Sequence, residues 1–86
     1  MVGASMLPTL RAGQVVVGVR LMGRAKPGMV VIARHNGLEK IKRVRQVRGG
    51  LVELRGDNSD ESTDSRTFGL LPHSAILARV VWPRRL

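Results

Sequence analysis

The side chains of this chain that could do chemistry are a serine near its start, Ser5, and several lysines further along. A serine hydroxyl is a poor nucleophile until a base removes its proton. The two histidines, His35 and His73, stand in an "HNG" turn and in a loop after a proline, and neither has a recognisable triad setting. A lysine is the alternative base, and it works only if burial lowers its pKa from about 10.4 toward the working pH.

The segment "LEKIKRV" offers two lysines, Lys40 and Lys42, and "SDESTDSR" offers hydroxyls that could orient an amine. Alternate residues of a strand share a face, so Lys42 shares its face with Val44 but also with Lys40 and Gln46. The alternation therefore does not decide whether Lys42 is buried. Ser5 could equally be a turn residue, and the lysines could belong to a solvated strand.

The sequence around these groups is typical of β-strands separated by turns. Segments rich in β-branched residues, without a long helical period, predict strands at 14–19, 29–34, 39–47, 51–54 and 75–82. The pairs Asn36-Gly37 and Gly49-Gly50 suit two-residue hairpin turns, which require positive φ. The sequence thus predicts an all-β domain with a three-stranded meander over residues 29–54.

Length and composition set limits on this domain. With 86 residues the chain is expected to be a single domain, 1–86, and with only Phe68 and Trp82 aromatic its core is made mostly of aliphatic side chains. The absence of cysteine excludes disulfides and thiolate metal sites. The uncharged runs 12–19 and 27–33 are far shorter than the roughly 18 residues of a membrane span, and the start lacks the regions of a secretory signal.

The charge of the chain is strongly basic and uneven. Fifteen Lys and Arg against six Asp and Glu give a net charge of +9, enough to attract nucleic acid or an anionic membrane surface. One hypothesis is therefore a nucleic-acid-binding β-domain whose basic strand, 40–48, follows phosphates. The near absence of aromatic side chains for base stacking argues against it. An inactive scaffold that keeps the fold is a further alternative.

Three motifs occur in order along the chain: "SMLPTL" from Ser5, "IKRV" around Lys42, and "GDNSDESTDSRTFG" from Gly56. Together they resemble the boxes of type I signal peptidases, the Ser/Lys endopeptidases that remove leader peptides. The resemblance frames the chain from residue 3 to about residue 82. It implies a small, coiled signal-peptidase-like β-sheet without a large insertion, because only 15 positions separate Lys42 from Asp57.

The resemblance also implies catalytic roles. Ser5 matches the nucleophile, and Lys42 matches the general base, whereas Lys40 lacks the arginine that follows the family's lysine. Ser62 matches the hydroxyl that orients the lysine amine. The backbone N–H of Ser5 would meet the developing oxyanion.

Two further groups of residues follow from the same resemblance. Charged side chains would support the loop around the lysine: Asp57, Asp64 and Arg66. Apolar side chains would line a shallow substrate pocket that suits small residues such as Ala before the cut: Met6, Leu10 and Ile41.

The mechanism implied by the resemblance needs no cofactor and no metal. Neutral Lys42 takes the proton of Ser5 as the hydroxyl attacks the scissile carbonyl, and a lysine-activated water then hydrolyses the acyl-enzyme. The expected partners are a protein that carries a leader peptide and a membrane surface, and nucleic acid is not expected. The sequence leaves the oligomeric state open.

The family places a membrane anchor just before the serine motif, where this chain has four residues. We expect either a membrane-associated domain whose anchor is absent from this chain, with its site on the extracytoplasmic face, or a short cytoplasmic maturation peptidase. The short spacing and the "VVWP" ending are similar to small actinobacterial peptidases that trim the leader of nickel-type superoxide dismutase. Self-cleaving repressors also use a Ser/Lys dyad, but their Ala-Gly cleavage site precedes the serine, whereas Ala12-Gly13 follows it.

Overall fold

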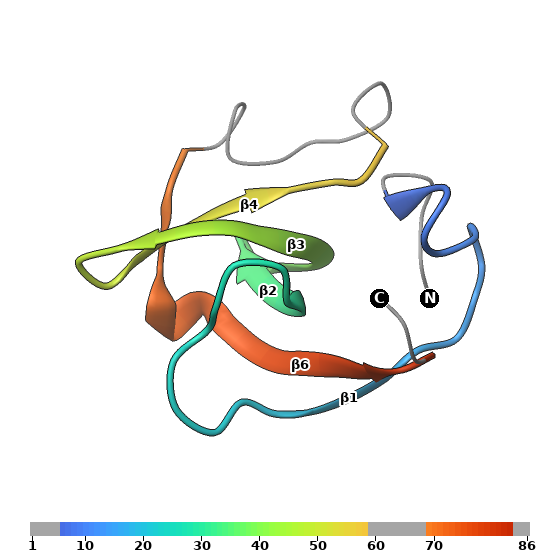
Figure 1. Cartoon of the computed structure of the whole chain (residues 1–86), viewed down its shortest axis with the longest axis horizontal. Helices are drawn as coiled ribbons and strands as arrows, with labels where there is room; N and C mark the ends of the chain where they lie inside the picture. Colours follow the sequence, from blue (N-terminus) through green and yellow to red (C-terminus); the bar gives the residue numbers. More distant parts are fainter. Residues whose placement is uncertain (1–5, 59–68, 84–86) are drawn as a thin grey trace.

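A computed structural model of the chain describes residues 6–58 and 69–83 and shows one antiparallel sheet in the order β1-β6-β2-β3-β4-β5 (Figure 1). The strands are β1 Val17–Arg20, β2 Val30–His35, β3 Leu38–Arg48, β4 Leu51–Arg55, β5 Leu71–Pro72 and β6 Ile76–Trp82, and the short 3-10 helix η2, His73–Ala75, precedes β6. The predicted all-β fold is confirmed. Within the described ranges no helix is long and apolar enough to cross a membrane.

The predicted meander is present as β2, β3 and β4, which pair in sequence order. Its two turns have the expected geometry, with φ of 52° and 77° at Asn36 and Gly37 and of 51° and 82° at Gly49 and Gly50. Positive φ at both central positions matches the right-handed twist of the strands that the turn joins. Glycine adopts it without steric cost and asparagine with little. The turn residues therefore set the register of the meander.

The strand ends differ from the prediction by a few residues, and one strand was not predicted. β1 begins at Val17 instead of residue 14, and β5 is a two-residue strand that pairs with the start of β4. A strand of that length carries no alternation that a sequence pattern could reveal. His73 was expected in a loop after a proline, but it lies half-buried in η2, where its Nε2 accepts a hydrogen bond from the Ala25 backbone N–H at 2.8 Å.

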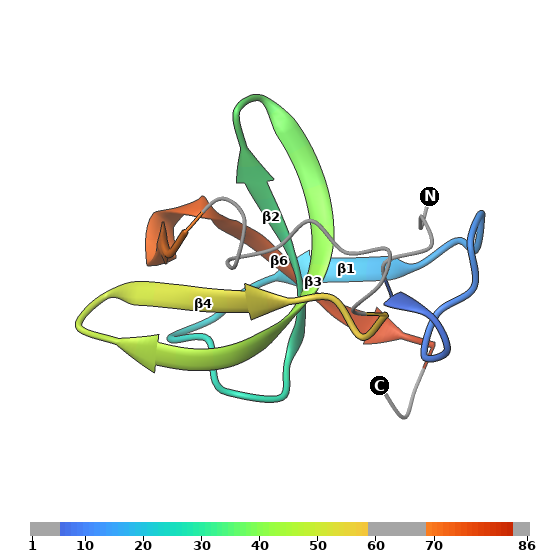
Figure 2. The ribbon, with the colours of Figure 1, turned by 90° about the horizontal axis from the view of Figure 1, so that it is seen from above.

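β3 is shared by two hairpins and bends between them. Its register with β4 shifts between Val44 and Gln46, which leaves Arg45 as an extra residue. Such a bulge bends a strand and increases its twist. Figure 2 shows the result, in which the β2–β3 hairpin and the β3–β4 hairpin project in different directions. Lys42 lies on β3 close to this bend.

The buried side chains form two clusters. The first cluster comprises Ala25, Val31, Ala33, Val44, Val52, Leu54 and Leu71. The second cluster comprises Met6, Leu10, Val30 and Val80, with Val16, Ile32 and Ile41 packed against it. Consecutive residues of β2 alternate between the clusters, because successive side chains of a strand point to opposite faces of the sheet. The sheet therefore buries apolar side chains on both of its faces.

Candidate active site

Lys42, the predicted base, lies in β3 with only 3% of its surface exposed. Among the described residues it is the one charged side chain that is buried. It pairs across the hairpin with Val31, and paired residues share a face, so its side chain emerges on the face of the first cluster. The competing lysine, Lys40, is only half-buried. Burial disfavours the charged form of an amine and favours the neutral form that a base requires.

Four of the predicted site residues lie outside the described residues: Ser5, Ser62, Asp64 and Arg66. Their roles stay predictions. The structure does describe their neighbours in the chain, namely Met6 directly after Ser5 and the start of the third motif up to Asn58.

The three residues predicted to line a substrate pocket lie together in the second cluster. Met6 and Leu10 are fully buried, and the partly buried Ile41 packs against this cluster. Met6 and Leu10 belong to one turn, in which the Leu10 N–H donates to the Met6 carbonyl at 2.9 Å. The residue after Ser5 and the residue before Lys42 therefore belong to the same apolar cluster.

Arg43 and Asp57 link the motifs through a bidentate ion pair. Arg43 Nε donates to Asp57 Oδ1 at 2.9 Å, and Nη2 donates to Oδ2 at 2.8 Å. Arg43 Nη1 also donates to the Gly28 carbonyl at 2.8 Å, and the Thr9 hydroxyl donates to Asp57 Oδ2. Asp57 thus joins the turn that follows Ser5 to the strand that carries Lys42.

The network is mostly shielded from water, since the side chains of Arg43 and Asp57 are 25% and 16% exposed. The hydrogen bonds from Arg43, with a further one from Thr9, hold the pKa of Asp57 below its ordinary 3.8 in spite of the opposing effect of burial. The hydrogen bond to Asp57 correspondingly raises the pKa of Arg43. Asp57 is therefore a charged support at neutral pH. Within the described ranges no three His, Asp or Glu side chains form a group that could hold a metal ion.

Sequence reasoning placed Asp57 as structural support but assigned no role to Arg43 or Thr9. The sequence feature that could have indicated a role for these two residues is their position inside the motifs, directly after Lys42 and within "MLPTL". A threonine and an arginine in such positions are also ordinary surface residues, so the motif alone does not reveal that they share one carboxylate. Only the folded chain brings them together.

Comparison with known proteins connects this arrangement to one family. The family model described as "Signal peptidase, peptidase S26" matches residues 34–84, more than half of the chain, and this range contains Lys42, Arg43 and Asp57. The chain belongs to the S26 signal peptidase family. The resemblance inferred from the three motifs is thereby confirmed.

This S26 family chain is 39% identical over 72 residues to the mitochondrial inner membrane protease subunit 1 of Xenopus tropicalis. The alignment takes in 67% of this chain and 43% of that protein, so the chain spans less than half the length of the relative. The family match begins at Arg34, after the turn from Met6 to Leu10. In this S26 member, the contact between Thr9 and Asp57 connects that turn to the matched part of the fold.

Proposed function

We propose that this chain is the catalytic domain of a serine endopeptidase that removes leader peptides, with Ser5 as the nucleophile and Lys42 as the general base. The observation that carries the proposal is the burial of Lys42, at 3% exposure, in a chain whose other described charged residues are not buried. Desolvation by burial penalises the charged form of an amine and so favours the neutral form, which can accept a proton.

The contacts around Lys42 support its pairing with Ser5. Met6, next to Ser5, shares the second cluster with Ile41, next to Lys42. The Thr9 hydroxyl and the Arg43 guanidinium bind the same Asp57 carboxylate. Two independent sets of contacts, one apolar and one polar, therefore tie the serine motif to the lysine strand, which is the arrangement that a Ser/Lys dyad needs.

The proposed reaction proceeds in two steps. Ser5 Oγ attacks the scissile carbonyl while Lys42 Nζ takes its proton, and the proton passes to the leaving amine as the C–N bond breaks. Lys42 then takes a proton from a water molecule, which attacks the acyl-enzyme ester. As the ester C–O bond breaks, that proton passes from Lys42 Nζ to Ser5 Oγ, which releases the leader as a carboxylic acid and restores the Ser5 hydroxyl and the neutral amine. Ser62 would orient the amine, and the backbone N–H of Ser5 would stabilise the oxyanion.

The substrate class that we propose follows from the second cluster. Met6 and Leu10 are fully buried and back the partly buried Ile41, which would offer a small apolar surface to the residue before the cut, as in leader peptides that end in Ala. The name of the relative places that protein at the mitochondrial inner membrane. By analogy, and because a net charge of +9 favours an anionic surface, we propose that this domain works on substrates at a membrane.

The test is to incubate the protein with a panel of leader peptides that vary in the residue before the cut, with and without detergent, and to map the products by mass. We expect a single cut after a small residue and no cut by the Ser5→Ala variant. Cleavage that persists in Ser5→Ala, or no cleavage of any peptide under either condition, would contradict the proposal.

A further inference from the structure

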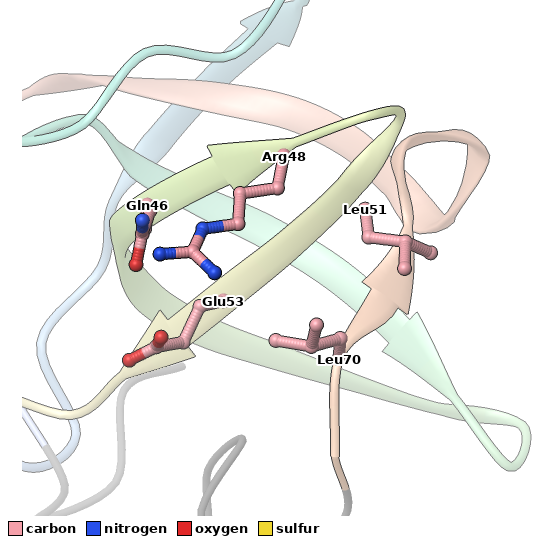
Figure 3. Close-up of a pocket in the computed structure, with 5 residues that line it drawn as sticks. All are labelled: Gln46, Arg48, Leu51, Glu53 and Leu70. Atoms are coloured by element: carbon pink, nitrogen blue, oxygen red, sulfur yellow. The ribbon is translucent and has the colours of Figure 1, made fainter.

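A pocket of about 240 Å³ opens on the β3–β4 hairpin, lined by Gln46, Arg48, Leu51, Glu53 and Leu70 (Figure 3). The hairpin register places Gln46 opposite Glu53 and Arg48 opposite Leu51. Directly opposed residues share a face of the sheet, so the four side chains from the hairpin line one surface. Leu70 comes from the segment that leads into β5. None of these residues belongs to the proposed catalytic site.

One side of the pocket carries a positioned cation. When the Gln46 amide is turned so that its oxygen faces Arg48, which is the orientation that satisfies both groups, the oxygen accepts from Arg48 Nη2 at 2.9 Å and from Nε at 2.7 Å. Gln46 is neutral, so it fixes the guanidinium without compensating its charge. In the part of the chain that the structure describes, Arg48 forms no ion pair with a carboxylate.

The one carboxylate of the pocket lining is already engaged by other cations. Glu53 Oε2 lies 3.3 Å from Arg45 Nε and 3.2 Å from Arg55 Nε. Because two guanidinium groups flank this one carboxylate, Glu53 does not cancel the charge of Arg48. The polar side of the pocket therefore attracts an anion.

The other side of the pocket is apolar. Leu51 and Leu70 are 42% and 48% exposed, and Figure 3 shows both of them apart from the polar groups of Gln46, Arg48 and Glu53. An occupant that covers these leucines removes apolar surface from water, which favours binding. The pocket thus presents one guanidinium and one apolar wall within a volume that fits amino-acid side chains.

We propose that this pocket binds an extended acidic peptide segment in which a carboxylate contacts Arg48 and an apolar side chain two residues away, on the same face of the peptide, covers Leu51 and Leu70. A guanidinium recognises a carboxylate through two parallel hydrogen bonds, which gives both strength and orientation. A peptide is favoured over a lipid surface because cation and apolar wall lie inside one small pocket instead of on a broad face. The site goes beyond the proposed peptidase function, and its test uses no cleavage.

The experiment is an NMR titration of the ¹⁵N-labelled protein with the capped peptide Gly-Asp-Ser-Leu-Ser-Asp-Gly, in which the leucine and both Asp side chains share one face of the extended chain. We expect saturable shift changes at residues 46–53 and 70, and binding at least tenfold weaker for Arg48→Gln. Arg24→Gln is the matched control, because it removes the same charge from an exposed loop residue and should leave binding unchanged. Leu51→Asn is a second variant. It should also weaken binding, because a polar side chain at this position removes apolar contact with the peptide's leucine.

Three outcomes would contradict the proposal of a peptide-binding site. Equal weakening by Arg24→Gln and Arg48→Gln would show general charge attraction. Equal binding of a peptide with Asn in place of both Asp residues would show that no carboxylate is recognised. If the protein bound phosphatidylglycerol vesicles through Arg48 but did not respond to the peptide, the pocket would be a lipid headgroup site instead.

Discussion

The Arg43 guanidinium and the Asp57 carboxylate meet through two parallel hydrogen bonds of 2.9 and 2.8 Å. The pair joins β3, at the residue after Lys42, to the motif that follows β4. Because the Thr9 hydroxyl binds the same carboxylate, one acidic side chain holds three distant parts of the chain in place. Together with the apolar second cluster, this contact holds the lysine strand against the serine motif.

Removing the charge of Asp57 should destabilise the fold. Asp57→Asn leaves the partly buried Arg43 guanidinium without its anion, and we expect the free energy of unfolding to fall by about 1–3 kcal/mol. Urea denaturation followed by circular dichroism measures the change. The control is Glu39→Gln, which removes the exposed pair with Arg34 and should cost less than about 1 kcal/mol. Equal losses in both variants would show that the Asp57 network contributes no more than a surface pair.

The same pair should give the protein an acid-sensitive component of stability. The unfolded chain binds the Asp57 proton near pH 3.8, whereas the folded chain binds it only at a lower pH, because the pKa of Asp57 is lowered. The stabilisation is therefore complete well above pH 3.8 and is lost as pH falls through the folded-state pKa. Urea midpoints measured from pH 2 to 6 should fall less steeply for Asp57→Asn than for the unmodified chain. Parallel curves of urea midpoint against pH for the two proteins would show that Asp57 does not contribute to the loss of stability in acid.

Lys42 and Lys40 should differ sharply in their effect on cleavage. Lys42→Met keeps an unbranched side chain at the buried position but removes the base, and we expect kcat to fall by about a hundredfold to ten-thousandfold. Lys40→Met, at the half-buried neighbouring position on the same face, should cleave near the unmodified rate. Initial rates on one leader peptide compare the two variants. The reverse ranking would assign the base to Lys40.

The rate should depend on pH in the way expected of a lysine base. We expect the pKa of Lys42 to lie below about 10.4, because burial penalises the charged amine. A plot of kcat/KM against pH should then rise into the mildly alkaline range, whereas a histidine base would level off near neutrality. A rate limb near pH 6.5 that disappears in a His35→Asn or His73→Asn variant would rule out the Ser/Lys mechanism.

Truncation of Ile41 should broaden the choice of substrate. Ile41→Ala shortens a side chain of the second cluster, so a peptide with Val before the cut should gain relative to one with Ala by about tenfold in kcat/KM. Leu77→Ala, which shortens an apolar side chain of β6 outside both clusters, is the matched control. An unchanged ratio of the two peptides in Ile41→Ala would show that Ile41 only packs in the core.

The class of fold and the order of the central strands follow from local features of the sequence. Asn36-Gly37 and Gly49-Gly50 predicted both tight turns, because the requirement for positive φ is local and few residues meet it. The three motifs predicted the family, which the match to residues 34–84 confirms. Ser5 and Ser62 lie outside the described residues, so their predicted interactions with Lys42 stay predictions.

Which charged side chains are buried, and which distant residues meet, depends on the folded chain as a whole. Alternation along β3 places Lys42 on a face, but burial depends on what packs against that face, here the first cluster drawn from several strands. The shared carboxylate of Asp57 joins residues 48 positions apart in the chain, at Thr9, and 14 apart, at Arg43. No local pattern encodes such a contact, because it forms only after the bent sheet has brought distant segments together.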